Sequence, residues 1–209
     1  MNYFHQQNFS VLCDELAAHD THLQFIISTY GYPPVWSREP SFATLIQIIL
    51  EQQVSLASAR AAFLRLQEKL GNIKPGQFIR LTDEELKECY FSRQKIHYSR
   101  HLANVLLNRQ LVLESLVHLK DEAVRAQLKQ VKGIGDWTAD IFLMMALHRS
   151  DCFPTGDIAL VKSIQEVKGL SPLTSKEEIL RIASAWKPYR TIAAYLLWHA
   201  YIRKRNIRV

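Results

Sequence analysis

Apolar residues recur along this chain with the spacing of amphipathic helices. Two neighbouring stretches show it most clearly: Phe42, Leu45, Ile46, Ile49 and Leu50, then Ala59, Phe63, Leu66 and Leu70. Steps of three and four residues place these side chains on one helix face, which predicts a buried stripe. No run of four to eight residues alternates apolar and polar side chains between turn residues, as a half-buried strand would. We therefore expect an all-α protein of about nine to eleven helices, given usual helix lengths.

Polar and conformationally special residues mark the expected helix ends. Starts are predicted where two residues have the capping-box spacing or a proline suits the first turn. These are Thr82 with Glu85, Thr174 with Glu177, Ser175 with Glu178, Pro75 and Pro188. Ends are predicted at Gly31, Gly71 and Gly169, because glycine readily adopts the left-handed conformation that closes many helices.

Proline-containing segments at 33–40 and 153–155 divide the single expected domain, 1–209, into two helical lobes. The first lobe runs from about residue 38 to residue 150 and contains a helix-hairpin-helix segment at 122–148. The second lobe combines residues 1–37 with residues 151–209. Two lobes that share two crossings leave an interlobe cleft, where functional sites commonly form.

The net charge of the chain indicates which kind of binding partner to expect. The 209 residues include 26 lysines and arginines and 20 aspartates and glutamates, a net charge of +6 with neutral histidine. This excess favours a polyanion such as nucleic acid, although a mildly basic protein without such a partner is equally compatible with it.

Cysteine usage and the N-terminal sequence bear on the compartment. The three cysteines, Cys13, Cys89 and Cys152, are too few and too dispersed for a disulfide framework or a four-cysteine metal site. The N-terminal residues lack the basic flank and apolar core of a signal peptide, and no apolar run approaches the ~18 residues of a membrane span. We expect a cytoplasmic protein that does not contact a membrane.

Two glycines one residue apart form the most informative segment. Gly133 and Gly135 lie between a helix expected to end near Val131 and another expected to begin near Asp136. Glycine allows positive φ and close approach, so backbone amides here could bind a phosphate, with Lys129 and Lys132 adding attraction. The alternative is a plain tight turn between two helices.

Asp157 precedes another amphipathic segment. An aspartate there is most often an N-cap, whose carboxylate accepts hydrogen bonds from the first helical amides. Those amides and the helix dipole also stabilise the carboxylate as an anion. An anion in a cleft can in turn stabilise a developing cation.

Four motifs in order carry a resemblance to a known family. They are Ile48-Ile49-Leu50-Glu51-Gln52-Gln53-Val54-Ser55, Phe91-Ser92-Arg93-Gln94-Lys95, Val131-Lys132-Gly133-Ile134-Gly135-Asp136-Trp137-Thr138-Ala139 followed by Asp157, and Trp186-Lys187-Pro188-Tyr189-Arg190 followed by Trp198. Together they resemble the HhH-GPD superfamily of base-excision DNA glycosylases over about residues 33–202. Within it they most resemble the DNA-3-methyladenine glycosylase II branch.

The resemblance implies a fold and a reaction. Members bind duplex DNA with the hairpin, flip a nucleotide into the cleft and hydrolyse its glycosidic bond. By matched position, Gly133, Gly135 and Thr138 would bind the DNA backbone, and Asp157 would be the catalytic carboxylate. Gln53 matches the side chain that fills the gap left by the flipped nucleotide; its alternative role is a surface residue at a helix end.

The resemblance also bears on specificity. A lysine that forms a Schiff base in bifunctional relatives is replaced here by Trp137, which implies a monofunctional enzyme without lyase activity. Alkylated purines carry positive charge and favour aromatic faces. Trp137 and Trp198 match aromatic positions of the family, and Trp36 and Phe42 are further candidates for the base pocket; packing is the alternative for each. The C-terminal cysteine quartet of the endonuclease III branch is absent, so no cluster is expected.

Several positions depart from the family pattern. Lys132 replaces a proline, Glu51 and Tyr90 stand where glycine is common, and Ile141 falls where some members have tyrosine. The chain is too short to hold the N-terminal α/β region of longer glycosylase II members, so we expect the catalytic core alone. These departures affect local geometry and leave the residues matched to the chemistry in place.

Competing functions make different predictions. A non-catalytic hairpin protein that binds bent or damaged DNA is the main alternative, and it would release no base. A sugar-directed glycoside hydrolase usually needs a second carboxylate facing Asp157, and a metal-dependent nuclease needs a ligand cluster; the sequence shows neither. We expect a monomer that requires no metal or other cofactor, with at most a monovalent cation at the hairpin carbonyls.

Overall fold

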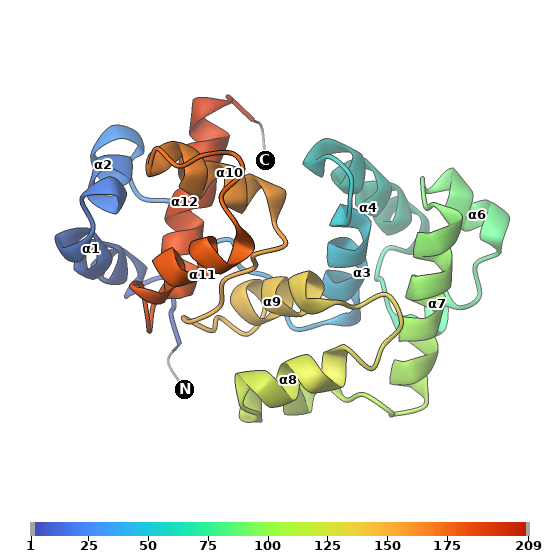
Figure 1. The fold of residues 1–209 in the computed structure, drawn as a ribbon. Coiled ribbons are helices and arrows are strands. Elements are labelled where there is room, and N and C mark those ends of the chain that lie inside the picture. Colours follow the sequence, from blue (N-terminus) through green and yellow to red (C-terminus); the bar gives the residue numbers. More distant parts are fainter. Residues whose placement is uncertain (1–2, 208–209) are drawn as a thin grey trace. The chain divides into compact units, whose positions relative to one another are not determined.

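The computed structural model describes residues 3–207, which form twelve α-helices and one short 3-10 helix (Figure 1). Within this range no strand occurs, and an isolated antiparallel bridge joins Tyr3 to Arg149. The all-α prediction is confirmed. The structure has more helices than the nine to eleven expected, because that number assumes usual helix lengths and α5 and α6 have only four and six residues.

The chain forms two compact units. The terminal unit comprises residues 3–37 and 143–207, and the central unit comprises residues 38–142. The terminal unit contains α1 (Phe9–His19), α2 (Thr21–Tyr30), α10 (Ile158–Val167), α11 (Lys176–Ser184) and α12 (Arg190–Lys204). The central unit contains α3 (Phe42–Glu51), α4 (Leu56–Leu70), α5 (Pro75–Phe78), α6 (Asp83–Glu88), α7 (Arg93–Leu107), the 3-10 helix η1 (Leu113–His118) and α8 (Asp121–Leu128). Helix α9 (Asp136–Met145) begins in the central unit and ends in the terminal one.

The second boundary, expected near residue 150, lies instead between Phe142 and Leu143. Residues 143–150 belong with the chain ends because backbone hydrogen bonds hold them there. The amide of Phe4 donates to His148 O over 3.1 Å, and the amide of Thr191 donates to Ser150 O over 2.9 Å. A proline pattern cannot reveal such pairing between distant segments.

Helix α12 forms the centre of the terminal unit and packs against α1, α2 and α10. Every residue from Thr191 to Ala200 is buried, so this helix is covered on all sides rather than amphipathic. Buried hydroxyls satisfy nearby backbone groups: Ser163 Oγ donates to Leu197 O over 2.6 Å, and Thr191 Oγ1 donates to Arg149 O over 2.7 Å. These two bonds fix the position of α12 relative to α10 and to the segment around Arg149.

Helix α3 forms the centre of the central unit, with α4 and α7 packed against it. The predicted apolar stripe is buried, and the Phe42 ring meets Phe78 edge-on at 5.6 Å. Arg38 binds both carboxylate oxygens of Glu51 at 3.1 and 2.7 Å, which ties the entering chain to the end of α3. Glu51 therefore has a structural partner where the family commonly has glycine.

Most predicted helix ends are confirmed. Thr82 and Glu85 form a complete capping box, Pro75 begins α5, and Gly31 and Gly71 cap α2 and α4 with positive φ. Gly169, also at positive φ, follows α10. Ser175 caps α11 by accepting from the amide of Glu178, so the alternative start at Thr174 is wrong. Pro188 lies before Tyr189, the N-cap of α12, and not in its first turn.

Candidate functional site

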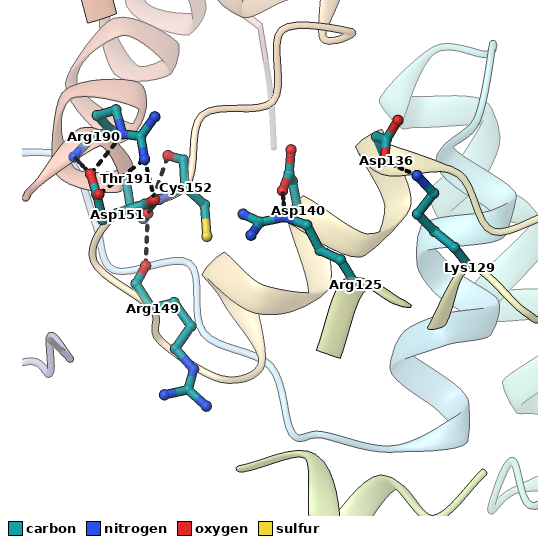
Figure 2. Close-up of polar contacts among 9 residues, drawn as sticks. All are labelled: Arg125, Lys129, Asp136, Asp140, Arg149, Asp151, Cys152, Arg190 and Thr191. Carbon is teal, nitrogen blue, oxygen red and sulfur yellow. Dashed lines mark hydrogen bonds and ion pairs between the residues drawn. The ribbon is translucent and has the colours of Figure 1, made fainter. Parts of the chain in front are cut away.

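The glycine segment forms a hairpin between α8 and α9. Helix α8 ends at Leu128, three residues before the expected Val131, and α9 begins at Asp136 as expected. The amide of Ile134 donates to Val131 O over 3.0 Å, and both side chains are buried, which closes the turn. Arg125 Nε donates to Asp140 Oδ1 over 2.8 Å and ties the two helices together (Figure 2).

The two hairpin glycines have different roles. Gly133 has φ +92°, and a Cβ there would lie 2.2 Å from Cγ of Tyr98 on α7. Gly135 has no positive φ, and a Cβ there would meet nothing within 4 Å. Gly133 is therefore required by the protein's own packing, whereas Gly135 leaves open space beside the backbone for a ligand.

Gln52, the C-cap of α3, holds the hairpin from a different part of the chain. Its Nε2 donates to Gly133 O and to Thr138 Oγ1, each over 2.9 Å. The Thr138 side chain is 1% exposed, so what Thr138 can offer a phosphate is its backbone amide in the first turn of α9. Among residues 3–207 the amides of Gly133 and Gly135 have no protein acceptor. The hairpin thus presents donors already fixed in position.

The two lysines expected to attract phosphate are in different states. Lys129 Nζ lies 2.6 Å from Asp136 Oδ1 (Figure 2), so its charge is already compensated. Lys132 is exposed, and its backbone amide donates to His101 Nδ1 over 3.2 Å. Lys132 is therefore the stronger candidate for a backbone contact with DNA.

Removing the Lys132 charge should change the salt dependence of DNA binding. For Lys132→Gln we expect the slope of log affinity against log salt to fall by about 0.9, the value for one phosphate contact. Lys129→Gln is the matched control and should change the slope less, because Asp136 already neutralises that lysine. Salt titrations of duplex binding measure both slopes, and a larger change for Lys129→Gln would contradict this assignment.

A hollow of about 550 Å³ lies beside the hairpin, within the central unit. Its walls come from three of the four sequence motifs: the end of α3, the start of α7 and the hairpin itself. The residues that line it are Gln52, Gln53, Val54, Tyr90, Ser92, Gln94, Lys95, Tyr98, Gly133, Ile134 and Gly135. Three motifs distant in sequence therefore build one site.

Two residues of the hollow have distinctive surroundings. Gln53 is exposed and has φ +57°, a conformation that is uncommon for residues other than glycine. Lys95 Nζ donates to Leu50 O over 2.5 Å and so satisfies a carbonyl at the end of α3. Burial lowers the pKa of Lys95. Gln53 is free to meet a ligand, whereas Lys95 supports the helix end that carries it.

Asp157 lies in the terminal unit as the N-cap of α10. Its Oδ1 accepts from the amide of Leu160 over 2.8 Å and from Nε1 of Trp198 over 3.1 Å. The first bond is the expected cap. The second comes from α12, 41 residues further along the chain, and fixes the carboxylate more firmly than a cap alone.

The aromatic candidates have different environments. Trp198 is 7% exposed and meets Trp36 at 6.3 Å and Tyr195 at 5.8 Å, while Trp36 is half-buried. Tyr195 donates its hydroxyl to Trp36 O over 2.8 Å. Trp36 thus has an accessible surface in a cluster that includes the indole bound to Asp157. Trp137 is half-buried in the first turn of α9.

Phe42 does not fit the expectation of a pocket residue. It is 4% exposed and packs against Phe78 in the core of the central unit. Helical periodicity alone cannot separate a core stripe from a lining stripe, which is why the sequence left both roles open.

Replacing Trp198 with phenylalanine should test the indole bond. The ring stays in the cluster, but the donor to Asp157 Oδ1 is lost, and we expect turnover to fall by about 10- to 100-fold, as for one hydrogen bond to a charged group. Trp186→Phe is the matched control, since Trp186 Nε1 donates to Asp20 Oδ2 over 2.8 Å in the same unit. Both variants should lose stability, but only Trp198→Phe should lose single-turnover rate.

Arg190 of the fourth motif braces the start of the last helix. Arg190 donates from Nε to Asp151 Oδ1 over 2.7 Å and from Nη2 to Asp151 Oδ2 over 3.0 Å (Figure 2). Within the basic C-terminal segment, Lys204 and Arg205 both pair with Glu166. Arg208 lies outside the described residues.

Two further findings concern metals and membranes. The described residues include no group of three or more histidine, cysteine and acidic side chains arranged to hold a metal ion. Among the same residues, no helix has both the length and the apolar character needed to cross a membrane.

A glycine hairpin between two helices, followed by an aspartate that caps a later helix, defines a helix-hairpin-helix protein. The model of the HhH-GPD superfamily base excision DNA repair protein family matches residues 46–188, which include the hairpin, the hollow and Asp157. The chain belongs to this family.

Known proteins extend the comparison to nearly the whole chain. DNA-3-methyladenine glycosidase from Bacillus halodurans is 31% identical, with a TM-score of 0.76, and the match covers 99% of this chain and 95% of that one. The 3-methyladenine DNA glycosylase Mag1 of Schizosaccharomyces pombe, solved with abasic DNA, is 26% identical with a TM-score of 0.79 and coverages of 90% and 94%. The alkylbase DNA glycosidase-like protein mag2 of the same yeast is 34% identical over 59% of either chain. The chain spans 66%, 59% and 56% of the lengths of three curated relatives.

Proposed function

We propose that this protein is a DNA glycosylase that hydrolyses alkylated purines, of the 3-methyladenine and 7-methylguanine type, from duplex DNA. One observation carries the proposal: the Asp157 carboxylate is held by a helix amide and by the indole of Trp198, beside an aromatic cluster. A simple N-cap needs only the first of these bonds. Membership of a base-excision repair family and the names of the relatives support the same reaction.

Asp157 would act on the sugar. Cleavage of the glycosidic bond builds positive charge on the deoxyribose, and a fixed carboxylate stabilises that charge. Water adds to C1′ while the base leaves with the bonding electrons, and the proton released by the water passes to the carboxylate or to solvent. An alkylated purine is already cationic, so it leaves as a neutral base without needing a second acid.

The hairpin would hold the DNA backbone. Backbone amides at the start of α9 suit a phosphate and read no sequence, which a repair enzyme requires because damage occurs in any sequence. Gln53 would fill the gap left by the flipped nucleotide. Trp36, the accessible member of the aromatic cluster that includes Trp198, would contact the damaged base. The solved complex of Mag1 with abasic DNA supports a DNA partner for this chain.

No Schiff base is expected, because Trp137 lacks an amine. We propose that the enzyme needs no cofactor. Among the hairpin carbonyls considered for a monovalent cation, that of Gly133 already accepts a hydrogen bond from Gln52. Three buried free thiols support a reducing compartment, and we propose that the enzyme acts in the cytoplasm as a monomer.

Release of free bases tests the proposal. The wild type should release methylated purines from methylated duplex DNA, detected by chromatography, and borohydride should trap no covalent complex. Salt-sensitive binding without release from methylated, hypoxanthine or ethenoadenine substrates would leave the non-catalytic DNA-binding alternative. A trapped complex would overturn the assignment of a monofunctional enzyme.

A further inference from the structure

Tyr90 is the second residue of the hollow with a left-handed backbone. Its φ is +63°, beside +57° for Gln53, and both side chains line the same hollow. The Tyr90 side chain is 60% exposed. A residue with a Cβ pays a conformational penalty in this region, and an exposed ring gains little burial to offset it. Burial of the ring therefore does not explain why a tyrosine occupies this left-handed position.

The local structure explains the Tyr90 backbone. The side chain interacts with Arg65 on α4, yet the residue remains 60% exposed, so this surface contact leaves much of the ring open. The amide of Tyr90 donates to Lys87 O over 2.9 Å, and that of Phe91 donates to Leu86 O over 3.1 Å. These two bonds form a Schellman motif at the end of α6, where the residue in the Tyr90 position is usually glycine. Glycine would satisfy this turn better than tyrosine.

The walls of the hollow complement the parts of a DNA strand. Amides of Gly133 and Gly135 can hold a phosphate, and the Gln53 amide can bond to a base edge. The Tyr90 ring could contact the third part of a nucleotide, the flat face of its base. Stacking of this kind does not depend on the base sequence. An intact duplex exposes no base face, whereas a flipped nucleotide leaves its neighbours exposed.

We propose that Tyr90 is a second DNA-binding residue, whose ring stacks on a base face exposed when the target nucleotide leaves the helix. The inference rests on the proposed glycosylase function and deepens it. Gln53 and Tyr90 then act together, one from the end of α3 and the other from the end of α6.

Binding of Tyr90→Gly to two duplexes tests the proposal, one with a tetrahydrofuran abasic-site analogue and one intact. Loss of one stacking contact should weaken binding to the abasic duplex by about 5- to 150-fold. Affinity for the intact duplex should change little. The Tm should stay the same or rise by up to about 4 °C, because glycine relieves the left-handed conformation. A merely structural tyrosine predicts the reverse: a lower Tm and no selective loss.

Two controls separate stacking from other causes. Tyr90→Phe keeps the ring and should bind the abasic duplex as the wild type does. Asn206→Gly changes the same position of a second Schellman motif, with φ +51° at the end of α12, and should alter neither affinity. Wild-type affinity in Tyr90→Gly, or an equal loss in Tyr90→Phe, would overturn the proposal. A wild type that neither prefers the abasic duplex nor releases bases would instead overturn the glycosylase function on which it rests.

Discussion

Replacing Asp157 with asparagine is expected to lower the rate of base release by at least about 10³-fold, since it removes the charge that stabilises the cationic sugar. Asparagine has the same shape, its oxygen can accept from Leu160 and Trp198, and it caps helices about as well as aspartate. The free energy of unfolding should therefore change by no more than about 1 kcal/mol. Single-turnover excision from methylated DNA and thermal unfolding measure the two quantities.

The matched control is Asp20→Asn, because Asp20 is also an N-cap of the terminal unit, at α2. Asp20 additionally pairs with Lys168 at 2.8 Å, so its replacement should lower stability. Its turnover should remain that of the wild type. Residual activity of Asp157→Asn within tenfold of the wild type would show that the aspartate is only a cap, and abasic-DNA binding should persist in either variant.

The sequence was most informative where local rules decide the outcome. Capping at Thr82, the glycine ends at Gly31 and Gly71, and the buried stripe of α3 depend on neighbouring residues, and the structure confirms each. The family resemblance is confirmed as well. The hairpin could be located from sequence because Gly133 and Gly135 are close together in the chain and lie within one motif.

Contacts between distant segments could not be predicted in this way. Gln52 lies inside a recognised motif, yet its two bonds to the hairpin reach 81 and 86 residues along the chain. Tyr98 carries no signal in sequence, although its ring excludes a side chain at Gly133. From sequence alone, Phe42 is a candidate for either a core or a pocket lining, because a periodic apolar position looks alike in both.

The difference between the two hairpin glycines leads to opposite expectations for alanine. Gly133→Ala places a Cβ 2.2 Å from Cγ and 2.7 Å from Cβ of Tyr98, and the Tyr98 Cβ cannot move away without shifting α7. Strain at φ +92° adds to this overlap. We expect the free energy of unfolding to fall by about 2–5 kcal/mol, with loss of DNA binding as the hairpin distorts. Thermal or urea unfolding measures the first effect.

Gly135→Ala is the matched variant, because its Cβ enters open space at an ordinary φ. Stability should change by about 1 kcal/mol or less, the difference between these residues near a helix start. The methyl group would instead occupy the space through which a phosphate approaches the amides, so affinity for duplex DNA should fall by about tenfold or more, close to the worth of one charge-assisted hydrogen bond. The salt slope should be unchanged, since no charge is removed. Equal stability of the two variants, or full DNA affinity in Gly135→Ala, would contradict this division of roles, in which Gly133 serves the fold and Gly135 serves the ligand.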